Sequence, residues 1–472
     1  MKILLVSMPF ENASIMTGGK FDMRDTDAYC LGLGYLHSYL ESKGHDVKTL
    51  SMNHNPAALD EIKETFRTWG APSIIGINTL TFNRTSSFQL IEWLRIYYPG
   101  ILITMGGIHA TICYEQILKK YPHVIIVRGE GEITMAEIAE ALGEGNELKL
   151  ANTPGLALTV WGVPTLTTPR PLICDLDTLP FPNHRYFQES AHRVAANIMT
   201  SRGCPNRCSF CCLNPTAGTT VRFRSVKNSV DEIEYIYKTF PNVKVIQFCD
   251  DAFFTRPSRV IEICNEIVRR GIKLKFICQA RAKPCTREMA EAMARAGFYM
   301  ITIGMETGDP GILKNIHKNF SLADILRLYK TFEGTGIKIF VLQIVGLPGE
   351  TWETMRNTGR FVRKLQGLQY NFYAFPNLAM VFPGTELAKN MYDAGIITED
   401  FWMTDALTPV YTVDHPLEEL EAMQEELIDW VSCDRLWTWN GFRKQWRLIP
   451  AIYWYKFWHF IWPRYVTKEE VW

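Results

Sequence analysis

The chain has 472 residues, 47% of them hydrophobic, and its 50 Lys and Arg residues balance 50 Asp and Glu residues. At roughly 150 residues per domain, this length predicts two to three domains with substantial cores. A formal charge of zero provides no basic face for nucleic acid, so the composition indicates a globular enzyme without a nucleic-acid partner.

The N-terminal sequence MKILLVSMPFENAS does not resemble a secretory signal. Its apolar run of about six residues is shorter than the roughly 7–15 that such a signal needs, and no run approaches the roughly 18 apolar residues that span a bilayer. We therefore expect a cytoplasmic protein. In that reducing compartment its scattered cysteines are expected to be buried hydrophobes rather than disulfides.

Residues 1–145 alternate short apolar runs with helical patterns. Strands are predicted at 2–8, 46–50, 74–80, 101–107 and 124–130, with an amphipathic helix at 33–44. This alternation is typical of an α/β domain with a doubly wound, Rossmann-like parallel sheet. Ligands of such sheets bind beyond the carboxyl ends of the strands, where the sequence has MGGIHAT (105–111) and VRGEGE (127–132).

Residues 146–193 are rich in Pro and Thr and lack a helical period. They are predicted to form a small hairpin followed by an extended linker, as is usual at a domain boundary.

The strand–helix alternation resumes in residues 194–395. Six strands are predicted, at 196–201, 244–250, 274–280, 299–305, 336–346 and 370–378. This pattern predicts a partial (β/α)6 TIM barrel with its active site at the carboxyl ends of the strands. The loop SRGCPNRCSFCCLNPT (201–216) follows the first of these strands, so its four cysteines lie where barrel chemistry is expected.

Residues 396–472 are predicted to form a small α-rich, aromatic subdomain. Its last part interleaves Trp with Lys and Arg, as around Trp454 and Trp458. One interpretation is an interfacial segment that gives peripheral membrane contact. The alternative is a subdomain whose Trp side chains pack on the barrel, which Pro450 and Pro463 favour because they interrupt any long helix.

The cysteine loop contains the spacing Cys-x3-Cys-x2-Cys at Cys204, Cys208 and Cys211. Three thiolates on a tight loop can hold three irons of a 4Fe–4S cluster and leave the fourth iron open. Zinc is the alternative, but a structural zinc site usually takes four ligands in two separate pairs, and no second pair follows. The pattern favours iron–sulfur, with Cys212 pointing away from the cluster.

Cys-x3-Cys-x-aromatic-Cys after the first strand of a partial barrel resembles the signature of the radical S-adenosylmethionine enzymes, with Phe210 at the aromatic position. The resemblance continues through QFCDDAFF (247–254), CQARAKP (278–284), IGMETGDPGIL (303–313), GLPGET (346–351) and FPGTEL (382–387). It implies that the open iron binds S-adenosylmethionine. Cleavage of that molecule then yields a 5′-deoxyadenosyl radical that takes hydrogen from a substrate.

The same resemblance implies contacts with S-adenosylmethionine for Phe210, Asp251, Gln279, Arg281 and Glu306. Glu306 matches a position whose carboxylate faces the ribose or the amino group, and Gln279 and Arg281 lie where the methionyl part is expected. For Asp251 the alternative is a helix N-cap, because a helix is predicted to begin near residue 257.

A strand–helix domain in front of such a barrel resembles the cobalamin-binding domain of the cobalamin-dependent subclass. The resemblance implies cobalamin contacts for Gly106, Gly107, Ile108, His109, Gly129, Glu130 and Gly131. Glycine removes the side chain where a flat macrocycle approaches the backbone, although two tight turns in a ligand-free domain would look the same. The motif Asp-x-His-x-x-Gly is missing from residues 1–150, which predicts a cobalt without a histidine ligand.

The resemblance therefore implies three cofactors: a 4Fe–4S cluster, S-adenosylmethionine and cobalamin. The usual reaction of the subclass moves a methyl group through methylcobalamin to an unactivated carbon or phosphorus. Its partners would be a small-molecule or lipophilic substrate and a reductant such as flavodoxin or ferredoxin. Ring formation or rearrangement with the same cofactors is the second interpretation, and a non-catalytic module that binds iron–sulfur and corrin is the third.

Overall fold

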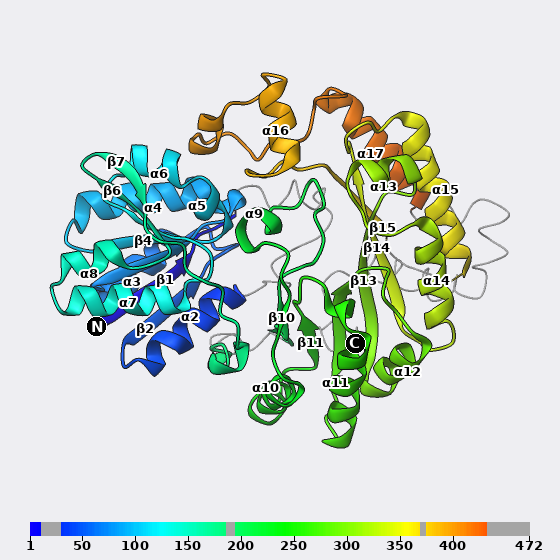
Figure 1. Ribbon diagram of the computed structural model, residues 1–472, viewed down its shortest axis with the longest axis horizontal. Coiled ribbons are helices and arrows are strands. Elements are labelled where there is room, and N and C mark those ends of the chain that lie inside the picture. Colours follow the sequence, from blue (N-terminus) through cyan, green and yellow to red (C-terminus); the bar gives the residue numbers. More distant parts are fainter. Residues whose placement is uncertain (11–29, 186–193, 369–373, 432–472) are drawn as a thin grey trace, which may run out of the picture.

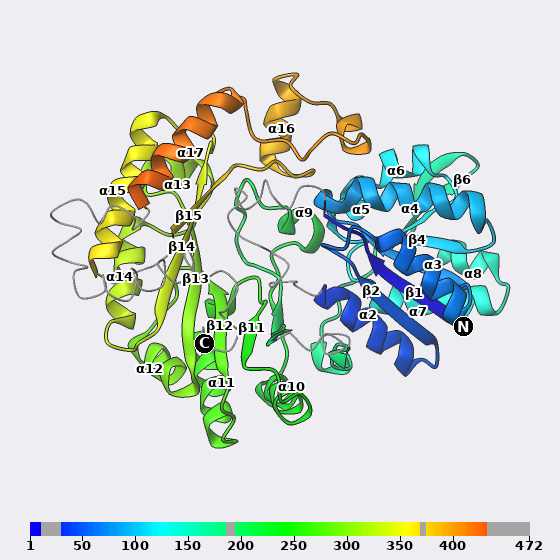
Figure 2. The same ribbon diagram turned by 180° about the vertical axis from the view of Figure 1, so that it is seen from behind.

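The computed structural model describes residues 1–10, 30–185, 194–368 and 374–431. It shows an N-terminal α/β unit beside a second, larger one (Figure 1), and the view from behind shows the short helix α9 (Leu213–Ala217) between them (Figure 2). The predicted α/β class with a Rossmann-like unit and a partial barrel is confirmed.

The N-terminal sheet has seven strands in the order β2-β1-β3-β4-β5-β6-β7. The parallel strands are β1 (Lys2–Ser7), β2 (Asp46–Ser51), β3 (Ile74–Asn78), β4 (Leu102–Gly106) and β5 (Ile125–Val127). The antiparallel strands are β6 (Leu156–Val160) and β7 (Val163–Leu166). The hairpin expected at the start of the linker thus extends this sheet instead of standing apart from it.

Both faces of that sheet are covered, which is why its strands read as continuous apolar runs. Ile3 and Leu5 pack against α2 (Leu31–Ser42) and α7 (Glu132–Gly143), whereas Leu4 and Val6 pack against α3 (Ala58–Trp69) and α4 (Arg84–Tyr97). The shorter helices are α5 (Ile108–Ile112), α6 (Tyr114–Lys120) and α8 (Glu147–Asn152).

The second sheet has six parallel strands in the order β15-β14-β13-β12-β11-β8. They are β8 (Ala195–Ile198), β11 (Val245–Phe248), β12 (Lys275–Ala280), β13 (Phe298–Glu306), β14 (Lys338–Val345) and β15 (Ala374–Leu378). The flanking helices are α10 (Val226–Thr239), α11 (Pro257–Arg269), α12 (Arg287–Ala296), α13 (Pro310–Asn315), α14 (Leu322–Phe332), α15 (Trp352–Leu368) and α17 (Leu417–Val431). Because β15 and β8 do not pair, the barrel is open.

Side chains in the sequence determine where several of these helices begin. Ser225 and Thr286 accept hydrogen bonds from backbone amides in the first turns of α10 and α12. Ser321 and Asp324 form a reciprocal capping box at the start of α14. Each cap satisfies backbone N–H groups of the first turn and so fixes the residue at which the helix begins.

The segment after the barrel returns to the N-terminal unit. Figure 1 shows α16 (Glu386–Asp393) at the top of the molecule, between the two units. Leu387, Met391 and Trp402 join the core that contains Ile91 and Ile117, so residues 379–411 fasten the two units together. The expected boundary at 395/396 falls within this segment. The Trp-rich stretch 434–472, with Trp454 and Trp458, lies outside the described residues.

Among the helices that the structure describes, none combines the length and the apolar character needed to cross a bilayer.

Candidate active site

The cysteine loop is held in one path by its backbone. Gly203 adopts a φ of +97°, and a Cβ there would lie 2.2 Å from the carbonyl oxygen of Thr220, so only glycine fits. The Gly203 amide donates to the carboxylate of Asp251 over 2.8 Å. Farther along, the Ser209 amide donates to the Ile316 carbonyl. The loop is therefore tied both to the end of β11 and to the turn after α13.

The three predicted cluster thiols, those of Cys204, Cys208 and Cys211, are half-buried in this loop. Burial, and after it the neighbouring thiols, raise the pKa of Cys211 to about 11. Within the described residues no three His, Cys, Asp or Glu side chains are placed to hold one metal ion; a 4Fe–4S cluster takes one thiolate per iron. Asn206 Nδ2 lies 3.5 Å from Cys204 Sγ, and Arg281 Nη1 lies 3.6 Å from Cys208 Sγ. Such N–H donors tune the potential of a cluster.

Glu306 ends β13 in a strained conformation. Its φ of +67° is rare for a residue with a side chain, and the pairing with β14 slips between Gly304 and Glu306. Lys318 Nζ lies 2.8 Å from Glu306 Oε1 and also donates to the Gly304 carbonyl over 3.1 Å. The same ammonium lies over the rings of Phe210 and Phe320, 5.3 and 5.6 Å from their centroids. Lys318, which no sequence motif marked, thus joins the strand-end carboxylate to the aromatic residue of the cysteine loop.

The two candidates at the end of β12 lie on the same side of the barrel. Gln279 is exposed, and Arg281 extends from the strand end toward Cys208 and the Phe320 ring. Nη2 of Arg281 is buried without a hydrogen-bond partner. Arg281 also lines a cavity of about 310 Å³, together with Asn206 of the cysteine loop. A buried, unpaired N–H group at this position suits an anionic group of a ligand.

Asp251 does not cap the following helix, because the N-cap of α11 is Arg256. Its carboxylate instead holds the Gly203 amide, and the residue lines a second cavity, of about 290 Å³, between the two units. The helix-cap alternative is therefore wrong. Asp251 lies between the cysteine loop and this interdomain cavity.

The interdomain cavity contains most of the predicted cobalamin positions. It is lined by Gly106, Gly107, Gly129, Glu130 and Gly131. On the sheet side its wall is apolar, where Leu5 and Met135 adjoin Gly76, and a Cβ on Gly76 would come within 2.8 Å of the Leu5 side chain. The barrel contributes Met199, Arg202, Gly203, Leu213, Ala217, Arg222 and Asp251. The glycines of the N-terminal unit form a flat part of this wall, and such a surface fits part of a flat corrinoid.

Ile108 and His109 do not line this cavity. His109 is completely buried, with Nδ1 3.2 Å from Thr81 Oγ1 and its ring edge-on to Trp402. Burial, and then the charge of Arg84, lower the pKa of His109 to about 3, so it is neutral. Its partner Trp402 comes from the distant segment after the barrel, so the local sequence could not reveal that His109 is buried. The described residues that line the cavity include no histidine.

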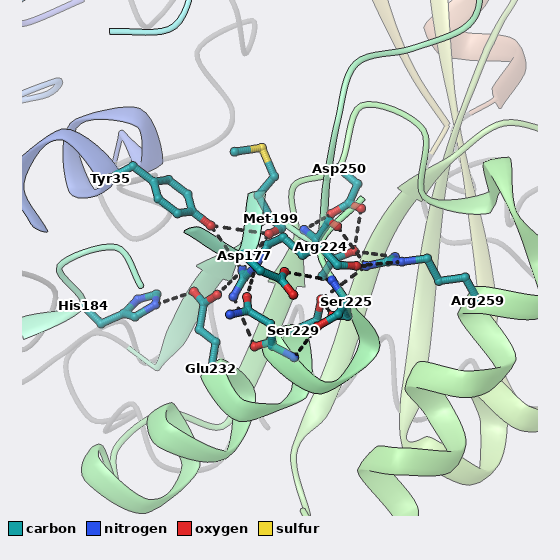
Figure 3. A network of polar contacts seen from close by, with 12 residues as sticks. Tyr35, Asp177, His184, Met199, Arg224, Ser225, Ser229, Glu232, Asp250 and Arg259 are labelled. Carbon is teal, nitrogen blue, oxygen red and sulfur yellow. Dashed lines mark hydrogen bonds and ion pairs between the residues drawn. The ribbon is translucent and has the colours of Figure 1, made fainter. Parts of the chain in front are cut away.

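A buried polar network joins the two units (Figure 3), and Met199, whose carbonyl accepts from Arg224 in this network, also lines the interdomain cavity. Glu232 of α10 accepts from Arg224 and lies 2.7 Å from His184 Nε2 of the linker. Arg224 Nη1 also lies 3.2 Å from the hydroxyl of Tyr35, which α2 directs toward the barrel (Figure 3). Although burial opposes ionisation, Arg224 and His184 hold the pKa of Glu232 below its usual range.

Comparison with known proteins gives two family matches: the B12 binding domain over residues 23–139 and the Radical SAM superfamily over residues 198–362. An uncharacterized methyltransferase of Pyrococcus horikoshii is 29% identical over 91% of this chain and 90% of that protein. The anaerobic magnesium-protoporphyrin IX monomethyl ester cyclase of Rubrivivax gelatinosus is 26% identical over 81% of this chain and 69% of that protein.

Among solved structures, the radical S-adenosylmethionine methyltransferase TsrM of Kitasatospora setae was determined with cobalamin and a 4Fe–4S cluster bound. It has a TM-score of 0.68 at 20% identity, covering 84% of this chain and 76% of that chain. At this identity the match shows the fold.

The chain thus contains a B12-binding domain followed by a radical S-adenosylmethionine domain. This is the domain composition of the cobalamin-dependent radical S-adenosylmethionine enzymes, which the chain resembles along most of its length. Its cofactors are a 4Fe–4S cluster, S-adenosylmethionine and cobalamin. Three loop thiols, the unpaired N–H of Arg281 and the glycine-lined cavity fit these groups. The contact of each individual residue with its cofactor stays a prediction.

Proposed function

We propose that this enzyme transfers a methyl group from S-adenosylmethionine, through cobalamin, to an unactivated carbon or phosphorus atom of a small or lipophilic molecule. The observation that carries the proposal is the interdomain cavity. Gly107 of the B12-binding domain and Gly203, which is next to Cys204 in the cysteine loop, both line it. A methyl carrier and a source of radicals must both reach one substrate, and holding reactants together is worth several orders of magnitude in rate.

When bound, the cofactors supply the transferable methyl group and the hydrogen-abstracting radical, and the chain supplies orientation. Arg281 offers a buried N–H for an anionic group, and Lys318 fixes the Glu306 carboxylate for a cationic or hydroxyl group. These two groups suit the opposite charges of an amino-acid moiety such as that of S-adenosylmethionine. The apolar wall formed by Leu5 and Met135 excludes water from the cobalamin side.

The methyltransferase of Pyrococcus horikoshii supports methyl transfer, since it aligns along nine-tenths of both chains. The cyclase of Rubrivivax gelatinosus, which aligns with 81% of this chain, favours ring formation as the second candidate. The two candidates differ in the fate of S-adenosylmethionine. Methyl donation leaves S-adenosylhomocysteine, whereas radical formation leaves 5′-deoxyadenosine and methionine.

The decisive experiment is anaerobic purification and reconstitution with iron, sulfide and hydroxocobalamin, followed by metal analysis. We expect about four iron atoms and about one cobalt atom per chain. Reduced protein incubated with S-adenosylmethionine and candidate acceptors should then form both S-adenosylhomocysteine and 5′-deoxyadenosine. Formation of 5′-deoxyadenosine alone would favour the cyclase, and an intact cluster that forms neither product would overturn the enzyme proposal.

The proposal includes two partners. A low-potential carrier such as flavodoxin or ferredoxin would reduce the cluster, and the aromatic residues 434–472 would contact a membrane that holds a lipophilic substrate. A liposome flotation assay tests the second point by comparing the full chain with one that ends near residue 433. Flotation of the full chain alone supports membrane contact, and equal behaviour of the two chains contradicts it.

A further inference from the structure

Arg202 and Arg222 face each other in a short ladder that flanks the cysteine loop. Strands β9 (Ser201–Arg202) and β10 (Arg222–Phe223) pair antiparallel, with Arg202 opposite Arg222. Their side chains are only 13% and 8% exposed. Like charges directly opposite each other destabilise a ladder, and burial strengthens the repulsion because water is excluded. This arrangement therefore needs anions close by.

The B12-binding domain supplies those anions. Glu130 Oε1 lies 2.9 Å from Arg202 Nη1, and Glu130 Oε2 lies 2.8 Å from Arg222 Nη1, so one carboxylate bridges both cations. Glu132 accepts from Arg202 Nη2 over 2.6 Å. Ile173 completes the cluster: its amide donates to Glu130, and its carbonyl accepts from Arg222. Buried charge pairs with this many hydrogen bonds hold their geometry far more strictly than exposed pairs do.

The two ends of this contact belong to the loops predicted to hold the two metal cofactors. Arg202 precedes Cys204 by two positions, and Gly203 between them cannot carry a side chain, because a Cβ there would lie 2.2 Å from the Thr220 carbonyl oxygen. Glu130 lies in the loop after β5 that lines the interdomain cavity. The Arg202 guanidinium also lies over the ring of Tyr35 from α2, 5.0 Å from its centroid.

We propose that Arg202, Arg222 and Glu130 form an interdomain clamp that fixes the distance between the corrin and the iron–sulfur cluster. The cofactors in this statement rest on the proposed function, whereas the clamp is a property of the chain itself. Both oxygens of Glu130 are occupied by the clamp, so Glu130 is a positioning residue that acts through Arg202 and Arg222. A misplacement of about 1 Å can lower a transfer rate by about a hundredfold.

The clamp is tested first in the full chain without cobalamin, by hydrogen–deuterium exchange. Arg202→Met, Glu130→Gln and the double variant are compared over peptides that cover 128–132 and 201–204. Each single change is expected to speed exchange about tenfold in both segments. The double change should speed exchange by less than the product of the two single effects, because both changes remove the Arg202–Glu130 bond, while Glu130–Arg222 and Arg202–Glu132 each survive one of them. Faster exchange only in the segment that carries the change, or fully additive effects, would overturn the clamp.

The distance is tested in the enzyme reconstituted with iron, sulfide and cobalamin. Pulsed EPR measures the dipolar coupling between the reduced cluster and cob(II)alamin. We expect one narrow distance in the unaltered chain and a broadened or shifted one in Arg202→Met at equal iron and cobalt content. An unchanged distribution contradicts the clamp. If the unaltered chain binds no cobalt, the proposed function and the positioning role fail together, while the exchange result still reports on the domain contact.

Arg270→Met is the matched control. Arg270 is 11% exposed and pairs with Asp231, Glu234 and Glu266, but it joins α10 to α11 within the barrel. It must leave both the exchange of 128–132 and the EPR distance unchanged, and an effect equal to that of Arg202→Met would contradict the proposal. Should Arg202→Met fail to fold, Glu132→Gln removes one bond of the same cluster and is expected to give a smaller change of the same kind.

Discussion

At the scale of single residues, the cysteines of one loop have different surroundings. The Cys208 thiol accepts a hydrogen bond from the guanidinium of Arg281. Cys212 is instead the N-cap residue of α9, and its backbone carbonyl accepts a hydrogen bond from the Thr216 hydroxyl. We predict that Cys208→Ala loses most of the iron after reconstitution, because a cubane held by three thiolates cannot spare one. Cys212→Ala should keep the iron content and the visible charge-transfer spectrum of the unaltered enzyme.

The control for that comparison is Cys285→Ala, which changes a half-buried thiol outside the loop. Equal loss of iron in Cys212→Ala and Cys208→Ala would contradict the division of roles within the loop. If Cys208→Ala retained its iron, the assignment of Cys204, Cys208 and Cys211 as cluster ligands would itself be wrong.

Residues whose chemistry is local in the chain could be predicted from the sequence, and residues whose partners come from elsewhere could not. The cysteine spacing lies within one loop, so its chemistry is readable directly. The role of Lys318 depends on Glu306 at a strand end and on Phe210 in another loop, which only the barrel brings together. The burial of His109 could not be predicted for the same reason, since its ring packs against that of the distant Trp402.

At the scale of elements, the turn that ends β4 shapes the wall that the B12-binding domain contributes to the interdomain cavity. Gly107 has a φ of +93°, and a Cβ there would lie 2.7 Å from the Thr79 carbonyl oxygen. We predict that Gly107→Ala destabilises the B12-binding domain by about 2–4 kcal/mol, because backbone strain adds to a clash that the turn cannot relieve. Urea unfolding and the affinity for hydroxocobalamin measure the two consequences.

Gly145→Ala is the matched variant for that prediction. Gly145 also has a positive φ, of +63°, but its Cβ would meet nothing within 4 Å, and it lies outside the cavity lining. It should cost about 1 kcal/mol and leave cobalamin binding unchanged. A similar loss of stability and affinity in both variants would show that the Thr79 contact is unimportant.

The strand cores could be predicted because they are buried on both faces and read as apolar runs. Their ends could not: the run 124–130 shrinks to Ile125–Val127, since the following glycine-rich turn leaves the ladder. The two-residue strands β9 and β10 have no periodic pattern, so the ladder that presents Arg202 and Arg222 was invisible in the sequence. The hairpin β6–β7 was predicted, but its pairing with β5 is a nonlocal contact that no local pattern specifies.

At the scale of the whole molecule, the two domains are joined by contacts that lie far apart in the chain. The clamp holds the cofactor loops, the segment 379–411 completes the N-terminal core, and the network around Glu232 ties α2 and the linker to the barrel. Because these three sets of contacts lie at different places along the domain interface, they restrict the motion of one domain relative to the other. The domain arrangement should therefore contribute to stability as well as to catalysis.

The network around Glu232 gives that stability a definite pH dependence. Arg224 and His184 lower the pKa of Glu232 from its ordinary 4.5, despite burial. A carboxylate whose pKa is lowered by folding contributes stability above its unfolded pKa and loses it as the pH falls toward the folded value. We predict that calorimetric stability of the unaltered chain declines below about pH 5.

The variant Glu232→Gln should lose about 3 kcal/mol of unfolding free energy at neutral pH, because Arg224 is left buried without its anion, and its stability should decline less on acidification. Glu262→Gln, on the exposed surface of α11, should match the unaltered chain at every pH, and a Glu232→Gln profile parallel to it would contradict the role of this ion pair.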